Sequence, residues 1–136
     1  MSVVEVETDF KPPARIVDRY VLTQVMNRHK ASGGRCVACR KGYAQDPHHV
    51  VFKSAGGDDV EDNIVPLCVF CHGTFHHGLP EDREAVAENI GRALKERHIR
   101  YVLRKLGVGA GDDYLRRRYH LSVPAKLTKQ MRRELM

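Results

Sequence analysis

The fold is decided by residues 36–76, which read CVACRKGYAQDPHHVVFKSAGGDDVEDNIVPLCVFCHGTFH. Two Cys-x-x-Cys pairs lie near the ends of this stretch, Cys36 with Cys39 and Cys68 with Cys71. Disulfides are rare in a reducing compartment, whereas two such pairs are the ligand pattern of a closed tetrahedral zinc site. The sequence therefore predicts a structural Zn²⁺ held by four thiolates, with a substantial structure between the two pairs.

The second pair also allows a different interpretation. Cys68-Val-Phe-Cys71-His72 has the Cys-x-x-Cys-His pattern of c-type haem attachment. That chemistry requires export to an oxidising compartment, and it would leave Cys36 and Cys39 without a role. We therefore favour the zinc site over the haem site.

The composition fits one globular domain. The chain has 136 residues, of which 42% are hydrophobic and 29% charged, with no Trp and only 7% aromatic residues. This balance predicts a modest core that a metal ion helps to hold. No run approaches the roughly 18 apolar residues of a membrane helix, and MSVVEVETDF lacks the basic start of a signal peptide. We expect an intracellular protein that does not span a membrane.

The charge is concentrated in the second half of the chain. The net charge is +6, and residues 81–136 alone carry fourteen Lys or Arg against eight Asp or Glu. A basic surface suits a polyanionic partner, of which nucleic acid is the commonest. DNA is therefore the expected partner, although a solvated helical surface would have the same composition.

The sequence around residues 36–76 predicts further elements. Apolar spacing predicts a helix over about 13–30. Two strand-like runs, 48–52 and 63–67, flank a Gly-Gly turn and predict a hairpin, followed by a short helix up to about His77. We expect one long helix from about 80 that ends at Gly107, Gly109 and Gly111, then a helix from Asp112, and a basic tail at 125–136 that is helical or disordered.

Five polar residues between and after the cysteine pairs carry the candidate chemistry: His48, His49, Asn63, His72 and His76. Their order, His-His…Asn…His, together with both cysteine pairs, resembles the HNH nuclease family, also called ββα-metal. The resemblance covers residues 36–77. It implies an α+β fold, with a ββα-metal core stapled by the four-cysteine zinc site and with flanking N- and C-terminal helices.

Helix geometry agrees with this resemblance. Residues on a helix turn by about 100° each, so His72 and His76 lie only about 40° apart on one face. Cys71 lies about 100° from His72 and can face a different ion. One short helix can thus serve two metal sites without sharing a ligand.

The resemblance implies a role for each residue. His48, with His72 and His76, binds a catalytic divalent metal; His49 is the general base; Asn63 bonds the backbone across the loop and fixes that base. Asp46 is an alternative ligand. Adjacent residues of a regular strand point to opposite faces, so His48 and His49 can serve one site only if the strand is irregular or the site straddles its edge.

The expected function is metal-dependent DNA cleavage that leaves 3′-hydroxyl and 5′-phosphate ends, as in the family. A His-only site accepts Zn²⁺, Ni²⁺, Mn²⁺ or Co²⁺, and Mg²⁺ less well. The alternative is a zinc-knuckle module that binds DNA or protein without catalysis. Phosphate contacts are expected from the following basic residues: Lys53, Arg97, Arg100, Arg104, Arg116, Arg117 and Arg118.

We divide the single domain of residues 1–136 into an N-terminal helix at 12–31, a nuclease core at 33–80 and a basic helical extension at 81–136. The arrangement resembles the stand-alone HNH proteins of phages and mobile elements. That resemblance suggests proteins of phage packaging or recombination as protein partners. His77 is expected at a helix end or facing a phosphate, whereas His29, His98 and His120 are expected on the surface or in the core without a role.

Overall fold

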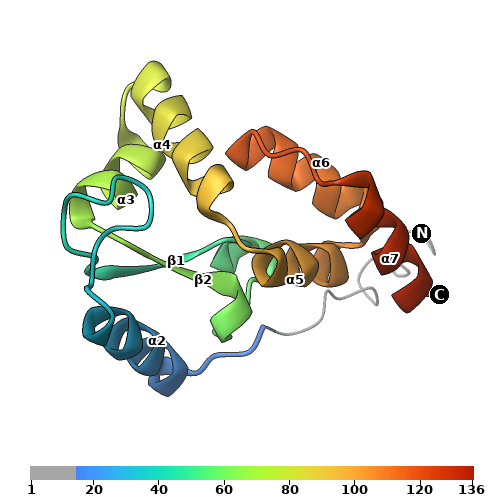
Figure 1. Ribbon diagram of the computed structural model, residues 1–136, viewed down its shortest axis with the longest axis horizontal. Helices are drawn as coiled ribbons and strands as arrows, with labels where there is room; N and C mark the ends of the chain where they lie inside the picture. Colours follow the sequence, from blue (N-terminus) through green and yellow to red (C-terminus); the bar gives the residue numbers. More distant parts are fainter. Residues whose placement is uncertain (1–14) are drawn as a thin grey trace, which may run out of the picture.

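The computed structural model describes residues 15–136 (Figure 1). Its elements are α2 (Arg19–Ala31), β1 (Asp46–His49), the 3₁₀ helices η1 (Lys53–Ala55) and η2 (Glu61–Asn63), β2 (Ile64–Leu67), α3 (Val69–His77), α4 (Pro80–Ala93), α5 (Glu96–Leu106), α6 (Val108–Tyr119) and α7 (Ala125–Glu134). Within this part of the chain, no helix has the length and apolar character needed to cross a bilayer.

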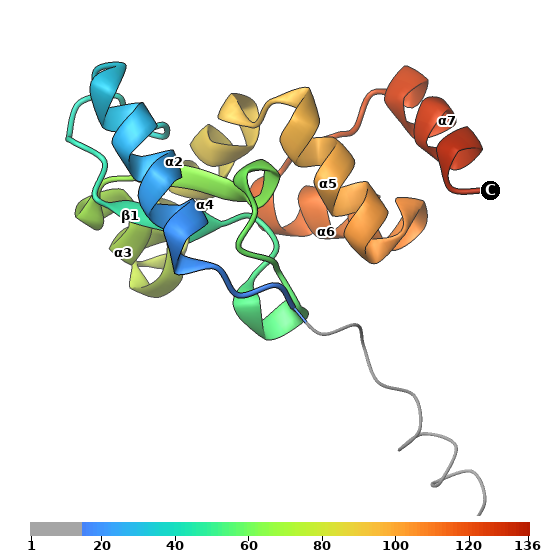
Figure 2. The ribbon, with the colours of Figure 1, turned by 90° about the horizontal axis from the view of Figure 1, so that it is seen from below.

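A two-stranded hairpin lies at the centre. Strands β1 and β2 pair antiparallel, with His48 opposite Val65 and His49 opposite Ile64. Helix α3 follows β2 after a single residue, and α2 packs on the hairpin as well (Figure 2). This hairpin followed by a helix confirms the α+β, ββα-metal fold class. Strand β1 begins two residues before the expected run 48–52 and ends three residues before the end of that run, and β2 begins one residue later than expected.

Helices α4, α5, α6 and α7 form the C-terminal part, and α6 packs against both α4 and α5 (Figure 1). Their apolar side chains meet the hairpin in one core, whose most buried members include Val50, Ile90, Val102, Leu115 and Tyr119. The core thus joins residues that precede the hairpin turn to the last turn of α6.

The prediction of one long helix after residue 80 was wrong. The helix breaks at Leu94, which is extended, and Lys95 caps the start of α5. The break keeps Leu94 in the core and turns α5 so that Ile99 and Val102 are also buried. Periodicity alone could not show it, because the apolar spacing continues on both sides.

The glycines after α5 also act differently from the prediction. Gly107, with φ of 91°, ends α5, but α6 begins at Val108 and contains Gly109 and Gly111. A Cβ on Gly111 would lie 3.0 Å from the Leu103 side chain, so this glycine allows α5 and α6 to approach closely. The basic tail is helical, which is one of the two states expected for it. Hydrogen bonds from Arg100 to Glu134 and Gln130 hold α7 against α5.

The N-terminal helix starts later than predicted. Residues 15–18 are not helical, and Asp18 caps α2 by accepting hydrogen bonds from the N–H groups of Tyr20 and Val21. The backbone N–H of Ile16 donates instead to Asp58, which holds this segment extended. The expected start at about residue 13 and the acidic residues 1–11 lie outside the described residues.

Candidate metal centres

The four cysteines converge on one point. Their Sγ atoms lie within 4.8 Å of one another, and those of Cys39 and Cys68 are 3.9 Å apart. Four sulfurs at about 2.3 Å from a tetrahedral ion would be separated by about 3.8 Å. The donor set and its spacing therefore fit Zn²⁺, and this is the cluster that the two Cys-x-x-Cys pairs predict.

The protonation of these thiols supports a cationic occupant. Burial raises the pKa of Cys39, but hydrogen bonds from the N–H groups of Gly42 and Lys41, together with those to the Cys36 and Cys71 side chains, outweigh it and lower that pKa to about 6. Burial raises the pKa of Cys68 and of Cys71. Four thiolates cannot share this volume without a compensating positive charge, and a divalent ion supplies that charge.

A second cluster joins the hairpin to α3. One nitrogen each of His48, His72 and His76 lies within 4.8 Å of the others. The ring centroids are 5.3 Å apart for His48 and His72 and 4.9 Å apart for His72 and His76, which are one turn apart on α3. Burial lowers the pKa of His48 well below its usual value, and His72 and His76 lower it further. A neutral imidazole is the form that binds a metal.

Two of these imidazoles are oriented by a hydrogen bond at one ring nitrogen, which leaves the other nitrogen for a metal ion. His72 donates from Nδ1 to Oδ2 of Asp46 over 3.0 Å, so its Nε2 is free to bind an ion. Asp46, the alternative ligand of the sequence analysis, therefore lies behind His72, which is a candidate ligand. Such a carboxylate fixes the imidazole tautomer and makes it a stronger ligand.

Tyr119 orients His48 by a hydrogen bond, as Asp46 orients His72. The Tyr119 hydroxyl donates to the Val50 carbonyl over 2.8 Å, so the His48 Nε2–H, at 2.9 Å, must donate to the tyrosine oxygen. Nδ1 of His48 is then the atom available to a metal ion. No sequence pattern indicates this contact, because 71 residues separate the two side chains.

His49 is not one of the three clustered histidines, but it lies next to them. Its Nε2 donates to Oδ1 of Asp59 over 2.7 Å. Burial lowers the pKa of His49, and Asp59 partly offsets this. Although strand geometry turns the two histidines apart, both line one hollow of about 390 Å³, together with Phe52, Lys53, His72 and His76. His48 and His49 are the last two residues of β1, so both can line one hollow at the end of this strand.

Asn63 closes the loop between the strands. Its Oδ1 accepts from the Val51 N–H over 2.8 Å, and its Nδ2 donates to the carbonyls of Val51 and Asp58. The side chain is fully buried, so these three bonds hold the end of β1 against the loop that carries Asp59. Asn63 therefore has the kind of backbone contact that the resemblance implied.

The family comparison agrees with this arrangement. Residues 36–78 match the family model described as HNH endonuclease. The match spans less than half of the chain, and it shows similarity to an HNH endonuclease domain for this segment alone. Comparisons with curated proteins and with solved structures returned no match. The HNH match covers both cysteine pairs, the histidine cluster, His49, Asp59 and Asn63, but ends before Tyr119.

The basic residues that we expect to contact DNA do not all lie near the histidine hollow, which is the hollow lined by His48, His49, His72 and His76. Lys53 lines the histidine hollow and is exposed. Arg118 lies with its guanidinium carbon 5.1 Å from the Phe52 ring centre. Arg116 and Arg117 pair with Asp112 and Asp113 one turn earlier on α6.

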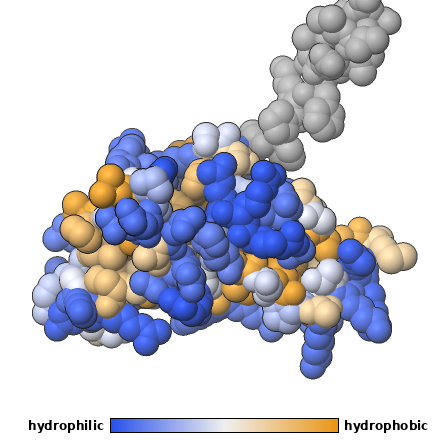
Figure 3. Space-filling view, turned by 90° about the horizontal axis from the view of Figure 1, so that it is seen from above, coloured by the Kyte–Doolittle hydropathy of each residue, from blue (hydrophilic) through white to orange (hydrophobic). Residues whose placement is uncertain are grey.

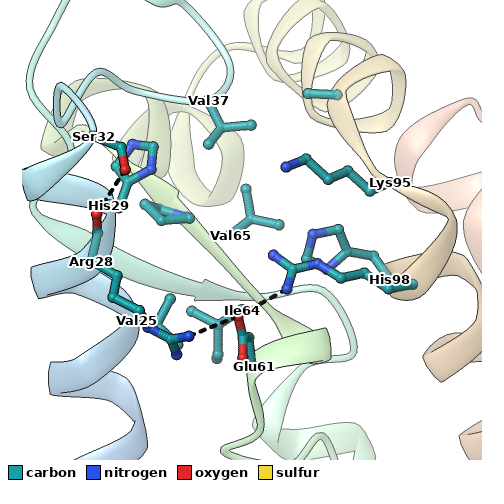
Figure 4. A pocket seen from close by; sticks show the side chains of 13 residues that line it. Val25, Arg28, His29, Ser32, Val37, Glu61, Ile64, Val65, Lys95 and His98 are labelled. Atoms are coloured by element: carbon teal, nitrogen blue, oxygen red, sulfur yellow. Dashed lines mark hydrogen bonds and ion pairs between the residues drawn. The ribbon is translucent and has the colours of Figure 1, made fainter.

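Arg97 and Arg100 are placed away from the HNH site. Arg97 pairs with Glu61 over 2.9 Å, beside a hollow of about 290 Å³ formed by α2, β2 and α5 (Figure 4). Arg100 pairs with Glu96 and Glu134, which ties α5 to α7. Arg104 is exposed on α5. Of the seven basic residues, Lys53 and Arg118 are therefore the ones whose contacts connect directly to the histidine hollow.

Proposed function

We propose that the HNH domain hydrolyses phosphodiester bonds of DNA and leaves 3′-hydroxyl and 5′-phosphate ends. One observation carries this proposal: three imidazole nitrogens lie within 4.8 Å of one another, and a further histidine, bound to a carboxylate, shares their hollow. A module that only binds DNA or protein has no use for this arrangement.

Each residue has a distinct role in the proposed reaction. Because His49 donates from Nε2 to Asp59, its Nδ1 carries the lone pair and takes a proton from the attacking water. The water oxygen bonds to phosphorus as the P–O3′ bond breaks. Asn63 holds the strand end on which His49 sits. His48, His72 and His76 would hold a divalent ion, which, when bound, polarises the phosphate and stabilises the charge on the leaving 3′-oxygen.

The two metal sites differ in their chemistry. The four thiolates select Zn²⁺, and this site has a structural role in the proposal. The three imidazoles accept Zn²⁺, Ni²⁺, Mn²⁺, Co²⁺ or, less well, Mg²⁺. The catalytic core of residues 33–80 acts within a single domain, and the helical extension at 81–136 supplies further DNA contacts, among them that of Arg118.

The test is cleavage of supercoiled plasmid by purified protein with each of these divalent ions. We expect nicked or linear product that requires an added ion and is lost in His49→Ala. DNA ligase should reseal the nicks, because it requires a 5′-phosphate and a 3′-hydroxyl. Binding of the plasmid without any cleavage would instead support the alternative of a non-catalytic zinc-knuckle module.

A further inference from the structure

A second hollow adjoins the histidine hollow, on the side of α4 and α6. It has a volume of about 360 Å³ and lies outside the HNH match except for three residues. Phe52 and His76 line both hollows, so the two hollows lie side by side at these two side chains. The face that carries α4 and α6 is largely hydrophilic (Figure 3).

The charges around this hollow are mostly positive. Arg83 of α4 and Arg117 and Arg118 of α6 line it, with Glu84 as the one lining acid. Among residues 15–136, neither Arg83 nor Arg118 makes an ion pair, whereas Arg117 pairs with Asp113. Two arginines of different helices therefore present unneutralised charge to one hollow.

Arg118 is held in place without being neutralised. Its guanidinium carbon lies 5.1 Å from the centre of the Phe52 ring and 5.8 Å from that of Tyr114. Stacking on an aromatic ring orients the guanidinium plane and leaves its edge N–H groups free. Those edges match two oxygens of one phosphate.

The hollow lies close to the metal centre. The ring centres of His76 and Phe52 are 5.5 Å apart, and Arg118 lies on the Phe52 ring. Phosphates follow one another about every 3.4 Å along the axis of a DNA strand. A strand with its scissile phosphate at the three histidines would therefore bring a neighbouring phosphate, within about three positions, to Arg118.

We propose that the hollow between α4 and α6 is a phosphate subsite that holds the backbone of the cleaved strand beside the scissile bond. Arg83 and Arg118 bind the phosphate from the two helices, and the Phe52 ring separates this phosphate from the one at the histidines. The subsite rests on the proposed nuclease function and adds to it a contact made by helices outside the HNH match.

The experiment uses the full chain and short DNA duplexes with one neutral methylphosphonate, placed at each of the three positions on either side of the cut. The variants are Arg83→Gln and Arg118→Gln, both at exposed positions. Arg92→Gln is the matched control, because Arg92 lies on α4 but pairs with Glu88 and does not line the hollow. Cleavage rates are measured with a divalent ion, and affinities without one.

We expect one methylphosphonate position to lower the cleavage rate and affinity of the wild type by about tenfold or more. With Arg83→Gln or Arg118→Gln, the duplex without a methylphosphonate should already show this loss of cleavage rate and affinity. The methylphosphonate should then lower either quantity little further. Each variant should also reduce the slope of log affinity against log salt concentration by about 0.9. Arg92→Gln should behave as the wild type does.

If the methylphosphonate cost the same in both variants as in the wild type at every position, the subsite would be overturned. A wild-type protein that cleaves no duplex would refute the proposed function. The salt dependence of the affinity would then still decide on the subsite, because it requires neither cleavage nor a known cut: unchanged slopes in both variants would overturn it.

Discussion

Nε2 of His49 lies 2.7 Å from Oδ1 of Asp59, and Arg15 binds the same carboxylate oxygen over 2.7 Å. The other carboxylate oxygen accepts the Asp18 N–H. Asp18, which precedes α2, and Arg15 thus hold the Asp59 carboxylate in place. That carboxylate in turn holds the His49 ring. A buried carboxylate with three partners orients the imidazole and determines which ring nitrogen carries the proton.

The first prediction concerns Asp59→Asn. The amide of Asn can donate to Nε2 of His49 and so favour the tautomer with the proton on Nδ1, which cannot accept a proton from water. We expect plasmid nicking to slow by at least about tenfold and by up to about 10⁴-fold, the cost of the wrong histidine tautomer in a serine-protease triad. Asp62→Asn, three residues further along, is the control and should nick at the wild-type rate. Equal rates for Asp59→Asn and the wild type would assign Asp59 a purely structural role.

The second prediction separates the base from the ligands. His49→Ala should fold and bind the divalent ion and DNA, while its nicking rate falls by roughly 10²- to 10⁴-fold. His72→Ala and His48→Ala should bind the ion less tightly, and their activity should partly return at high ion concentration. Calorimetric stoichiometry and nicking rates measure both effects. If His49→Ala lost the ion and His48→Ala kept it, the two assignments would have to be exchanged.

The third prediction concerns the four-thiolate site. One zinc per chain should survive mild chelation, and Cys68→Ser should give insoluble or molten protein. Structural zinc contributes on the order of 10 kcal/mol to the folding of small zinc domains. Metal analysis and thermal unfolding followed by circular dichroism test this. A Cys68→Ser protein with the wild-type melting temperature would contradict the structural role of the ion.

The fourth prediction concerns His98, which is buried and bonds the carbonyl of Asp62 through Nδ1. Burial lowers the pKa of His98 in the folded protein below its usual value of 6.5. The unfolded chain therefore binds more protons below pH 6.5, and the free energy of unfolding should fall as the pH falls through that value, by up to about 1.4 kcal/mol per pH unit for one such group.

The matched variant for this effect is His98→Asn, whose amide can still donate to the Asp62 carbonyl but does not titrate. Urea unfolding at several values between about pH 5 and pH 7 should give a shallower pH dependence for the variant. Acid release of zinc affects both proteins, so the difference between them reports on His98. Two parallel curves would show that His98 is not kept neutral by the fold.

The features that could be predicted from the sequence are local in the chain. The two residues between the cysteines of a pair, and the three between His72 and His76, bring those side chains together by turn and helix geometry alone. The hairpin could also be predicted, because a Gly-Gly turn separates two β-prone runs. These elements include the ligands of both proposed ions.

The features that could not be predicted depend on packing between distant segments. Asp59 follows a glycine-rich turn and looked like part of a turn, but the fold buries it against His49 and Arg15. Arg97 and Arg100 looked like free cations on a basic helix, yet Glu61 and Glu134 approach them from other elements. Charge counts along a sequence do not show which cations are already paired in the fold.

The hydrogen bond from His48 to Tyr119 bears on how this domain could be moved between proteins. Residues 36–78 contain the three histidines, but the hydroxyl that orients one of them belongs to the last residue of α6. A graft of the HNH segment alone would leave that hydroxyl behind, and Val50 would also lose a donor to its carbonyl. A recipient scaffold would have to supply an equivalent tyrosine, or α6 would have to be transferred together with the segment.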